Sequence, residues 1–443
     1  MNPDIDVGSE SVQPSNKRVL YALRMAVIWV LAPNVVNLSL GGRLDSIGGQ
    51  SPITETTLGN LVWWASGSVT LVVIIFAYRS RPKAPRRIVW NVVLCALMFF
   101  LSVKVIESAF SRDIYSVVGL VVWILMLGLV GTSKFSIEDL RVWGEVGLAI
   151  VIVSFALAFF GGSGWMSDTS YVVGQGKDGL LSERLLAGPF NHSNQLGIIV
   201  AITLPFVAFW KYGPKLKIVA LMLMGAALLM SASRSSALVL VLVVGFALVL
   251  LAVRKIFSIS FGNFVIGSAL SGAVALIVLI PYFGLPDEFA TGRGIIWRVS
   301  TEVALSSFSF PASPELLQPD GWVSLAIGYA PSHSHNSTLT ALIVGGWAFF
   351  AINVAVLITA MHRAVAVASF STIPALSVLT LLGLSAVETV WRLDSLSQST
   401  GLAALIVLTM TSIYESTTHK EDSLPVKKSL AIPKNRFPGS RRI

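Results

Sequence analysis

The stretch IVALMLMGAALLMSASRSSALVLVLVVGFALVLLAV, residues 218–253, decides the fold class of this chain. Arg234 is its only charged residue, and serines flank that arginine on both sides. The segments before and after the arginine, near 218–233 and 236–253, each approach the ~20 apolar residues that cross the hydrocarbon of a bilayer. The stretch therefore predicts two membrane helices joined by a short turn that carries a cation.

Similar apolar runs recur along all 443 residues, of which 54% are hydrophobic and 12% are charged. An average soluble protein has about 25% charged residues. The sequence therefore predicts an all-α polytopic integral membrane protein with about twelve transmembrane helices and a large external loop between helices nine and ten. The expected spans lie near 19–40, 59–78, 88–106, 114–132, 142–162, 194–210, 218–233, 236–253, 263–283, 336–360, 373–390 and 399–414.

The net charge of +9 reflects membrane orientation rather than binding of nucleic acid. If the N-terminus is cytoplasmic, 22 of the 32 Lys and Arg residues fall in internal loops or tails. Cytoplasmic segments of membrane proteins carry such an excess, so we expect both termini inside. The external exceptions are Arg43, Arg112, Lys177, Arg184, Arg234, Arg293, Arg298 and Arg392.

The spans divide the chain into five regions. Residues 1–18 form a cytoplasmic tail, 19–283 carry helices one to nine, 284–335 form the large external loop, 336–414 carry helices ten to twelve, and 415–443 form a basic cytoplasmic tail that we expect to be disordered. Within the large loop, residues 294–305 have apolar residues at helical spacing and predict a short helix. Cys95 is the only cysteine, which excludes an internal disulfide.

Four polar clusters fall on the external side of this topology. They are Arg184–Asn194, Ser231–Ser236, Gly292–Arg298 and the pair His333 and His335, which precedes Asn336. Guanidinium groups bind phosphate oxygens through paired hydrogen bonds and keep their charge. Several arginines and two imidazoles at the outer membrane surface therefore suit a lipid-anchored phosphate or diphosphate that carries a reactive sugar.

Each cluster also has a purely structural interpretation. Arg234 would extend to the lipid headgroups from a turn, Arg293 would be a solvated loop residue, and His192 with Asn194 would cap the sixth span. Asn336 would cap the tenth span or orient a histidine ring. The acidic residue nearest to the histidine pair along the chain is Asp320, fifteen residues before His335, so the sequence gives a carboxylate base little local support.

At these clusters the chain resembles the O-antigen ligase and polymerase superfamily of bacterial polysaccharide assembly. The matching stretches, in order, are RLLAGPFNHSNQLG at 184–197, SRSSA at 233–237, TGRGIIW at 291–297, and HNSTL at 335–339 followed by GGW at 345–347. The resemblance covers about 180–360, and the first 180 residues match in hydropathy alone. The glycine spacing after the His-Asn pair departs from the family's glycine–x–x–glycine.

The resemblance implies an inverting, metal-independent glycosyltransferase of the GT-C type that needs no cofactor. Its donor would be an undecaprenyl-diphosphate-linked glycan at the outer face of the bacterial plasma (inner) membrane, and its acceptor a glycan or lipid hydroxyl. By position, the diphosphate would be bound by Arg234 and Arg293, with Arg184 and Arg298 nearby. His335 would be the general base with His333 as a lesser partner, and Asn336, His192 and Asn194 would orient the acceptor.

Two other functions remain open at this point. A chain with twelve spans suits a transporter, such as a flippase of lipid-linked oligosaccharides, although flippases keep polar residues in a central cavity, and here Arg24 and Lys104 are the only bases within spans. A non-catalytic or peptidoglycan-polymerase relative is the second alternative. Within the enzyme interpretation, ligase and polymerase share these motifs, with a slight preference for polymerase.

Overall fold

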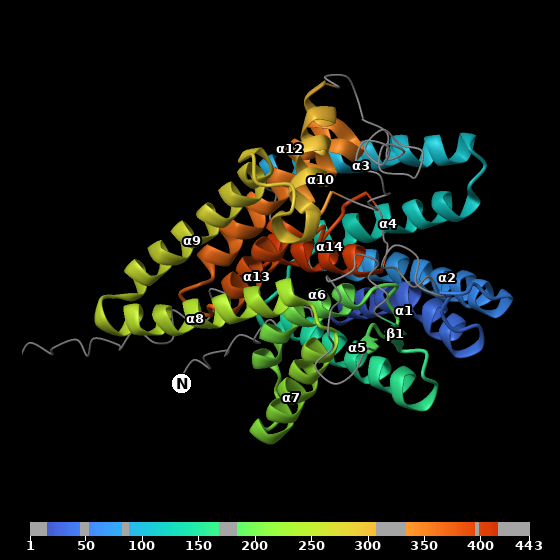
Figure 1. The fold of residues 1–443 in the computed structure, drawn as a ribbon, viewed down its shortest axis with the longest axis horizontal. Helices are drawn as coiled ribbons and strands as arrows, with labels where there is room; N and C mark the ends of the chain where they lie inside the picture. Colours follow the sequence, from blue (N-terminus) through green and yellow to red (C-terminus); the bar gives the residue numbers. More distant parts are fainter. Residues whose placement is uncertain are drawn as a thin grey trace, which may run out of the picture.

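The computed structural model describes residues 16–44, 53–81, 88–167, 184–306, 334–394 and 398–414, and helices make up most of them (Figure 1). Eight helical segments are long and apolar enough to cross a membrane. They contain α1 (Lys17–Leu40), α2 (Thr57–Ser80), α3 (Ile88–Phe110), α4 (Ile114–Thr132), α5 (Arg141–Phe160), α8 (Arg234–Ile256), α9 (Ile259–Leu279) and α12 (Ser337–Ala366).

The remaining elements are shorter. The helices are α6 (Ser193–Thr203), α7 (Pro214–Met230), α10 (Phe289–Ser306), α13 (Ile373–Val387) and α14 (Gln398–Thr411), and 3-10 turns occur at Glu138–Leu140, Leu204–Phe209 and Ile280–Tyr282. An antiparallel pair of strands, β1 (Trp165–Ser167) and β2 (Arg184–Leu186), precedes α6.

Each of the twelve predicted spans overlaps a helix, and α10 contains the short helix predicted at 294–305. Four of the predicted spans coincide with the shorter helices α6, α7, α13 and α14, so the count of twelve crossings stays a prediction. His333, residues 307–332 of the large loop, residues 1–15 and residues 415–443 lie outside the described residues.

Helix α12 is kinked where the sequence departs from the family's glycine spacing. Gly346 has φ 64° and ψ −169°, a conformation that only glycine adopts readily. A side chain on the preceding Gly345 would meet Phe349 at 2.4 Å. The two adjacent glycines thus allow the bend and the close approach of Phe349.

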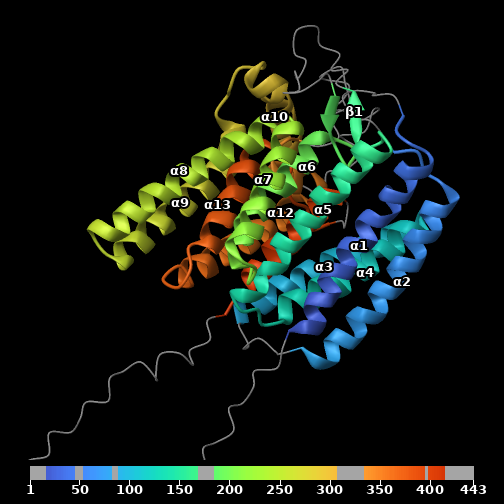
Figure 2. The same ribbon diagram turned by 90° about the horizontal axis from the view of Figure 1, so that it is seen from below.

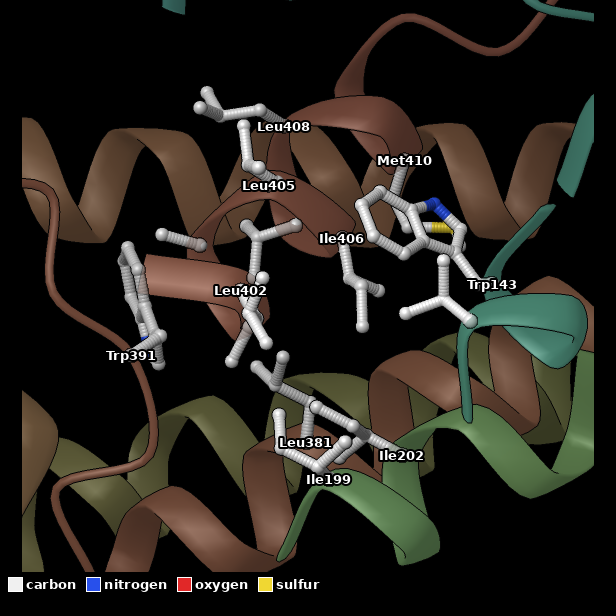
Figure 3. Close-up of a cluster of buried hydrophobic side chains, with 14 of the residues drawn as sticks. Trp143, Ile199, Ile202, Leu381, Trp391, Leu402, Leu405, Ile406, Leu408 and Met410 are labelled. Carbon is white, nitrogen blue, oxygen red and sulfur yellow. The ribbon is translucent and has the colours of Figure 1, made fainter. Parts of the chain in front are cut away.

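The buried centre of the molecule surrounds α14, in which every residue from 401 to 411 is buried. Figure 3 shows Leu402, Leu405 and Ile406 of α14 between Trp391 and Trp143. A helix that is apolar all round needs neighbours on every side. Here α4, α6, α12 and α13 supply them. By contrast, large aliphatic residues of α8, such as Leu238, Val241 and Leu242, are exposed on the outside, as expected of a lipid-facing surface.

The helices form two groups around this centre. Figure 2 shows α1–α4 together on one side of the molecule and α8 with α9 on the opposite side, with α12 and α13 between them. The paired contacts agree, because α1 packs on α2, α3 on α4, and α9 on α13.

The two ends of the bundle differ in character. At one end lie Lys134, Lys211 and Arg254, with contacts such as Lys211 to Glu138 at 2.8 Å and Arg254 to the Ala368 carbonyl at 2.9 Å. At the other end lie the four polar clusters singled out from the sequence, so far as the structure describes them. The first is called here the basic end and the second the site end.

We predict that the site end faces outward and the basic end faces the cytoplasm, because basic residues concentrate in cytoplasmic loops. In a Cys95→Ser background, Ser111→Cys in the turn between α3 and α4 should react with a membrane-impermeant thiol reagent in spheroplasts. Tyr212→Cys, before α7, should react only after lysis. The reverse pattern of labelling would invert the orientation.

Candidate functional site

A buried carboxylate organises the site end. Glu388 follows the last residue of α13, and its side chain is only 4% exposed. Oε1 of Glu388 contacts Nη2 of Arg293 from α10, and its Oε2 lies 3.1 Å from Nδ1 of His335, just before α12. A carboxylate is costly to bury unless cations or hydrogen-bond donors surround it. Three residues distant in sequence therefore meet at one point.

The carboxylate beside His335 comes from a part of the chain that is distant in sequence. Asp320 lies outside the described residues, and the carboxylate that contacts His335 is Glu388, 53 residues downstream. The contact arises because α13 returns along α12, so that its last turn comes back to the start of α12. One sequence feature could have indicated this contact. Glu388 is a lone glutamate at the end of an apolar helix, on the same predicted side of the membrane as His335.

Asn336 holds the start of α12. Its Oδ1 accepts hydrogen bonds from the backbone N–H of Thr338 (3.0 Å) and Leu339 (2.9 Å), and its Nδ2 donates to the carbonyls of Ile277 (3.0 Å) and Ala386 (3.3 Å). Asn336 is completely buried. It is therefore a helix cap that also ties α9 and α13 to α12, and it lies too deep to contact an acceptor.

His335 itself adopts a strained backbone conformation, with φ 53°. Non-glycine residues rarely occupy this region, and surrounding contacts must hold them there. Its side chain is 27% exposed, in contrast to Glu388 beneath it. The ring therefore has one nitrogen on the buried carboxylate and part of its surface open to solvent.

Hydroxyl groups fix the segment that follows Glu388. The Ser337 hydroxyl accepts a hydrogen bond from the Val390 N–H (3.0 Å) and donates to the Glu388 carbonyl (3.3 Å). Thr340 bonds the Thr389 hydroxyl at 2.8 Å. The first turn of α12 therefore fixes the backbone at Glu388 and the two residues after it.

Arg293 is set into the structure rather than solvated, so the interpretation as a free loop arginine is wrong. Its side chain is 14% exposed. A side chain on the next residue, Gly294, would come within 1.9 Å of the Pro286 carbonyl oxygen, so only glycine allows this packing. Among the described residues, Glu388 is the residue that pairs with the Arg293 guanidinium through Nη2. The other N–H groups of the guanidinium can therefore contact a ligand.

Arg298 does not join Arg293. Five residues along a helix rotate a side chain by about 140°, which places the two arginines on different sides of α10. Arg298 is exposed and pairs with Asp287, Nη2 to Oδ2, at 2.8 Å. That hydrogen bond raises the pKa of Arg298.

The first two polar clusters meet each other. A side chain on Gly197 of α6 would lie 2.3 Å from Cβ of Ser233, so the turn before α8 packs directly on α6. Ala232 in that turn packs against the buried cluster of Met166, Leu185 and Ala187 around β1 and β2. Arg184 and Arg234, both exposed, therefore belong to neighbouring segments at the site end.

His192 caps α6, as its structural interpretation predicted. Its Nδ1 accepts a hydrogen bond from the Asn194 N–H at 2.9 Å, and the two residues are half-buried. The pair sits at the helix start, beside the turn that carries Arg234.

Helix α13 connects the two sets of residues. A side chain on Gly383 would lie 2.9 Å from Val239 of α8, which marks where the helices cross. Arg234 lies five residues before Val239, and Glu388 lies five residues after Gly383. Because α8 begins and α13 ends at the site end, both residues lie toward that end, each about 7.5 Å from the crossing point along its helix. Arg234 is therefore at the level of the Glu388 cluster.

Arg43 is a functional candidate that the motifs missed. Its guanidinium is buried and donates to the carbonyls of Ser163 and Phe190, each at 2.8 Å, and to that of Gly188. Burial lowers its pKa to about 10. Arg43 thus holds the turn before α6 in place. In the sequence, Arg43 stood out solely as one of the basic residues on the external side.

No protein-family model matches this chain, and a search of curated proteins finds no match. The resemblance to the O-antigen ligase and polymerase superfamily therefore rests on the four short motifs.

We predict that Glu388→Ala destabilises the protein by about 3–5 kcal/mol, because it leaves Arg293 as a buried charge without its partner. The double variant Arg293→Gln with Glu388→Gln removes both charges and should recover most of that loss. Thermal unfolding in detergent measures both effects. If Glu388→Ala and the double variant were equally unstable, the ion pair would not be the reason.

Proposed function

We propose that the protein is an inverting glycosyltransferase that transfers or polymerises undecaprenyl-diphosphate-linked glycan units onto an acceptor hydroxyl. It would act in the bacterial plasma membrane, with its site end outward and both termini in the cytoplasm. One observation carries the proposal. His335, part of whose ring is exposed, has Nδ1 on the buried carboxylate of Glu388.

This arrangement suits a general base. A carboxylate bonded to one imidazole nitrogen fixes the ring's tautomer and stabilises the imidazolium that forms when the other nitrogen takes a proton. Glu388 is buried and held by Arg293, so in this proposal it is a positioning residue, while His335 meets the acceptor. An arginine cannot replace His335 as a base because it stays protonated.

The reaction would be a single displacement. The acceptor oxygen attacks the anomeric carbon of the donor sugar as His335 takes the hydroxyl proton, and the bond from that carbon to the diphosphate oxygen breaks on the opposite face. The electron pair leaves with undecaprenyl diphosphate. The products are a new glycosidic bond of inverted configuration and a released lipid diphosphate.

The leaving diphosphate gains negative charge, and cations already in place stabilise such charge best. Arg234 lies at the level of Glu388, and Arg184 lies on the segment beside it. Arg293 has a double role in this proposal, because it neutralises Glu388 and directs its remaining N–H groups toward an anion. Arg298, engaged by Asp287, is the weakest of the four candidates.

We predict that His335→Gln lowers turnover by ~10²–10⁴ and leaves donor binding largely intact, because glutamine keeps polarity and approximate size but cannot take the proton. The measurement is formation of glycan product from lipid-linked donor in reconstituted membranes. An active His335→Gln protein would refute the base assignment. Accumulation of donor on the cytoplasmic side in a deletion strain would point to the flippase instead.

We predict that Arg234→Ala lowers the rate of transfer by ~10²–10³. Arg234→Lys should recover only part of that loss, because lysine lacks the planar pair of donors. The matched control is Lys255→Ala, which removes an exposed cation from the opposite end of the same helix and should leave the rate unchanged. Full activity of Arg234→Ala at normal expression would remove this residue from the diphosphate site.

A further inference from the structure

A cavity lies at the site end, between α1, α2, α4 and α14. Its volume is about 690 Å³, which falls within the range of about 300–1,000 Å³ that is usual for small-molecule sites. Its described lining includes no residue of the four polar clusters found in the sequence. The proposed transfer reaction therefore leaves this cavity without a role.

Aromatic rings form part of its wall. Trp29, Trp63 and Tyr115 line the cavity, with the centroid of the Trp63 ring 5.5 Å from that of Trp29 and 5.3 Å from that of Tyr115. Tyr115 is 47% exposed, whereas Trp29 is almost completely buried. The rings therefore form a rigid apolar face, exposed at Tyr115 and buried at Trp29, on which a flat ligand can stack.

Polar side chains line the same cavity. Asn34, Asn60 and Gln398 contribute amides, and Glu55 and Asp394 contribute carboxylates. An amide both donates and accepts hydrogen bonds, as a hydroxyl does. Arg392 bonds both oxygens of Asp394, which neutralises that carboxylate, while Glu55 has no ion pair among the described residues. The wall therefore suits many hydroxyl groups and disfavours an anion.

Another cavity, on a different side of α1, has an apolar lining and so differs from the cavity with the aromatic wall. That cavity lies between α1 and α5, measures about 480 Å³, and apart from Arg24 and Glu145 is lined by apolar residues such as Leu31 and Val153. Arg24 and Glu145 pair with each other at 2.5 Å. Of these two cavities, the aromatic and amide side chains among the described residues line the one on the side of α1 that faces α2 and α4.

The cavity with the aromatic wall is connected to the proposed reaction centre. The Gln398 side chain accepts a hydrogen bond from the Asn191 N–H at 3.4 Å, and Asn34 donates to the Pro189 carbonyl at 3.0 Å, both in the turn before α6. Along the chain, six residues separate Glu388 from Asp394 and span at most about 22 Å. A glycan of a few sugars could therefore reach from one to the other.

We propose that this cavity binds an uncharged segment of a glycan. The apolar face of a pyranose ring would stack on Tyr115 and Trp63, and its hydroxyls would bond the amides of Asn34, Asn60 and Gln398. Whether that glycan is the donor or the acceptor of transfer rests on the proposed function. The binding of sugar in the cavity is independent of the proposed function.

Site-directed cross-linking tests this binding without knowledge of the sugar. The full chain is produced in its source cells with p-benzoylphenylalanine in place of Tyr115, and membranes are irradiated. The matched control places the same cross-linker at Tyr212, which is 54% exposed but lies at the basic end. We expect a periodate-sensitive glycan adduct at position 115 and none at position 212.

The chemistry of the adduct distinguishes the possible ligands. A glycan adduct that loses a lipid diphosphate in mild acid contains the diphosphate-linked donor, and a glycan adduct from which mild acid releases no lipid diphosphate contains the acceptor; either supports the proposal. Asn60→Ala, which removes one amide, should lower the yield by about tenfold. A phospholipase-sensitive adduct, no adduct, or a yield unchanged by Asn60→Ala would overturn it.

A last comparison separates the two proposals. The glycan adduct at position 115 should persist in a His335→Gln background, because the cavity does not include His335. If the adduct persists and His335→Gln also remains active, the cavity stands and the proposed base fails. If His335→Gln is inactive but no glycan is captured at position 115, the cavity proposal fails alone.

Discussion

The burial of one carboxylate constrains the whole site end. Glu388 lies where α13 emerges from the apolar centre, and its charge needs partners there because little water reaches it. Arg293 and His335 meet this need, and in doing so they bring α10 and the start of α12 to the end of α13. Ser337 and Asn336 bond backbone carbonyls of Glu388 and Ala386, which fixes the start of α12 beside the carboxylate.

The same carboxylate explains why the arginines are not equivalent. Arg293 is partly committed to Glu388, Arg298 is paired with Asp287 on another side of α10, and Arg43 holds backbone carbonyls in a buried cradle. Arg184 and Arg234 are exposed on neighbouring segments. The arginines at the site end therefore differ in both burial and partners.

Helix α1 separates two cavities of different chemical character. One side of α1 borders an apolar cavity with α5, and another borders the cavity with the aromatic and amide wall. The turn at Pro189–Asn191 touches both, and Arg43 holds that turn. The part of the chain whose sequence matched in hydropathy alone therefore has a direct structural link to the residues that carry the motifs.

Sequence alone determined the all-α membrane fold, because long apolar runs such as 218–253 are stable only where helices satisfy their own backbone in lipid. It also predicted the ends of most helices and singled out His335, Arg293 and Arg234, whose roles stay predictions. It did not predict Glu388 beside His335, the contacts that Arg43 makes with the turn before α6, or the Trp63–Tyr115 wall, because the partners of these residues lie on distant segments. Only the packing of α13 against α8, α9 and α12 decided which charges meet, since burial, rather than spacing along the chain, selects the partner of a charge.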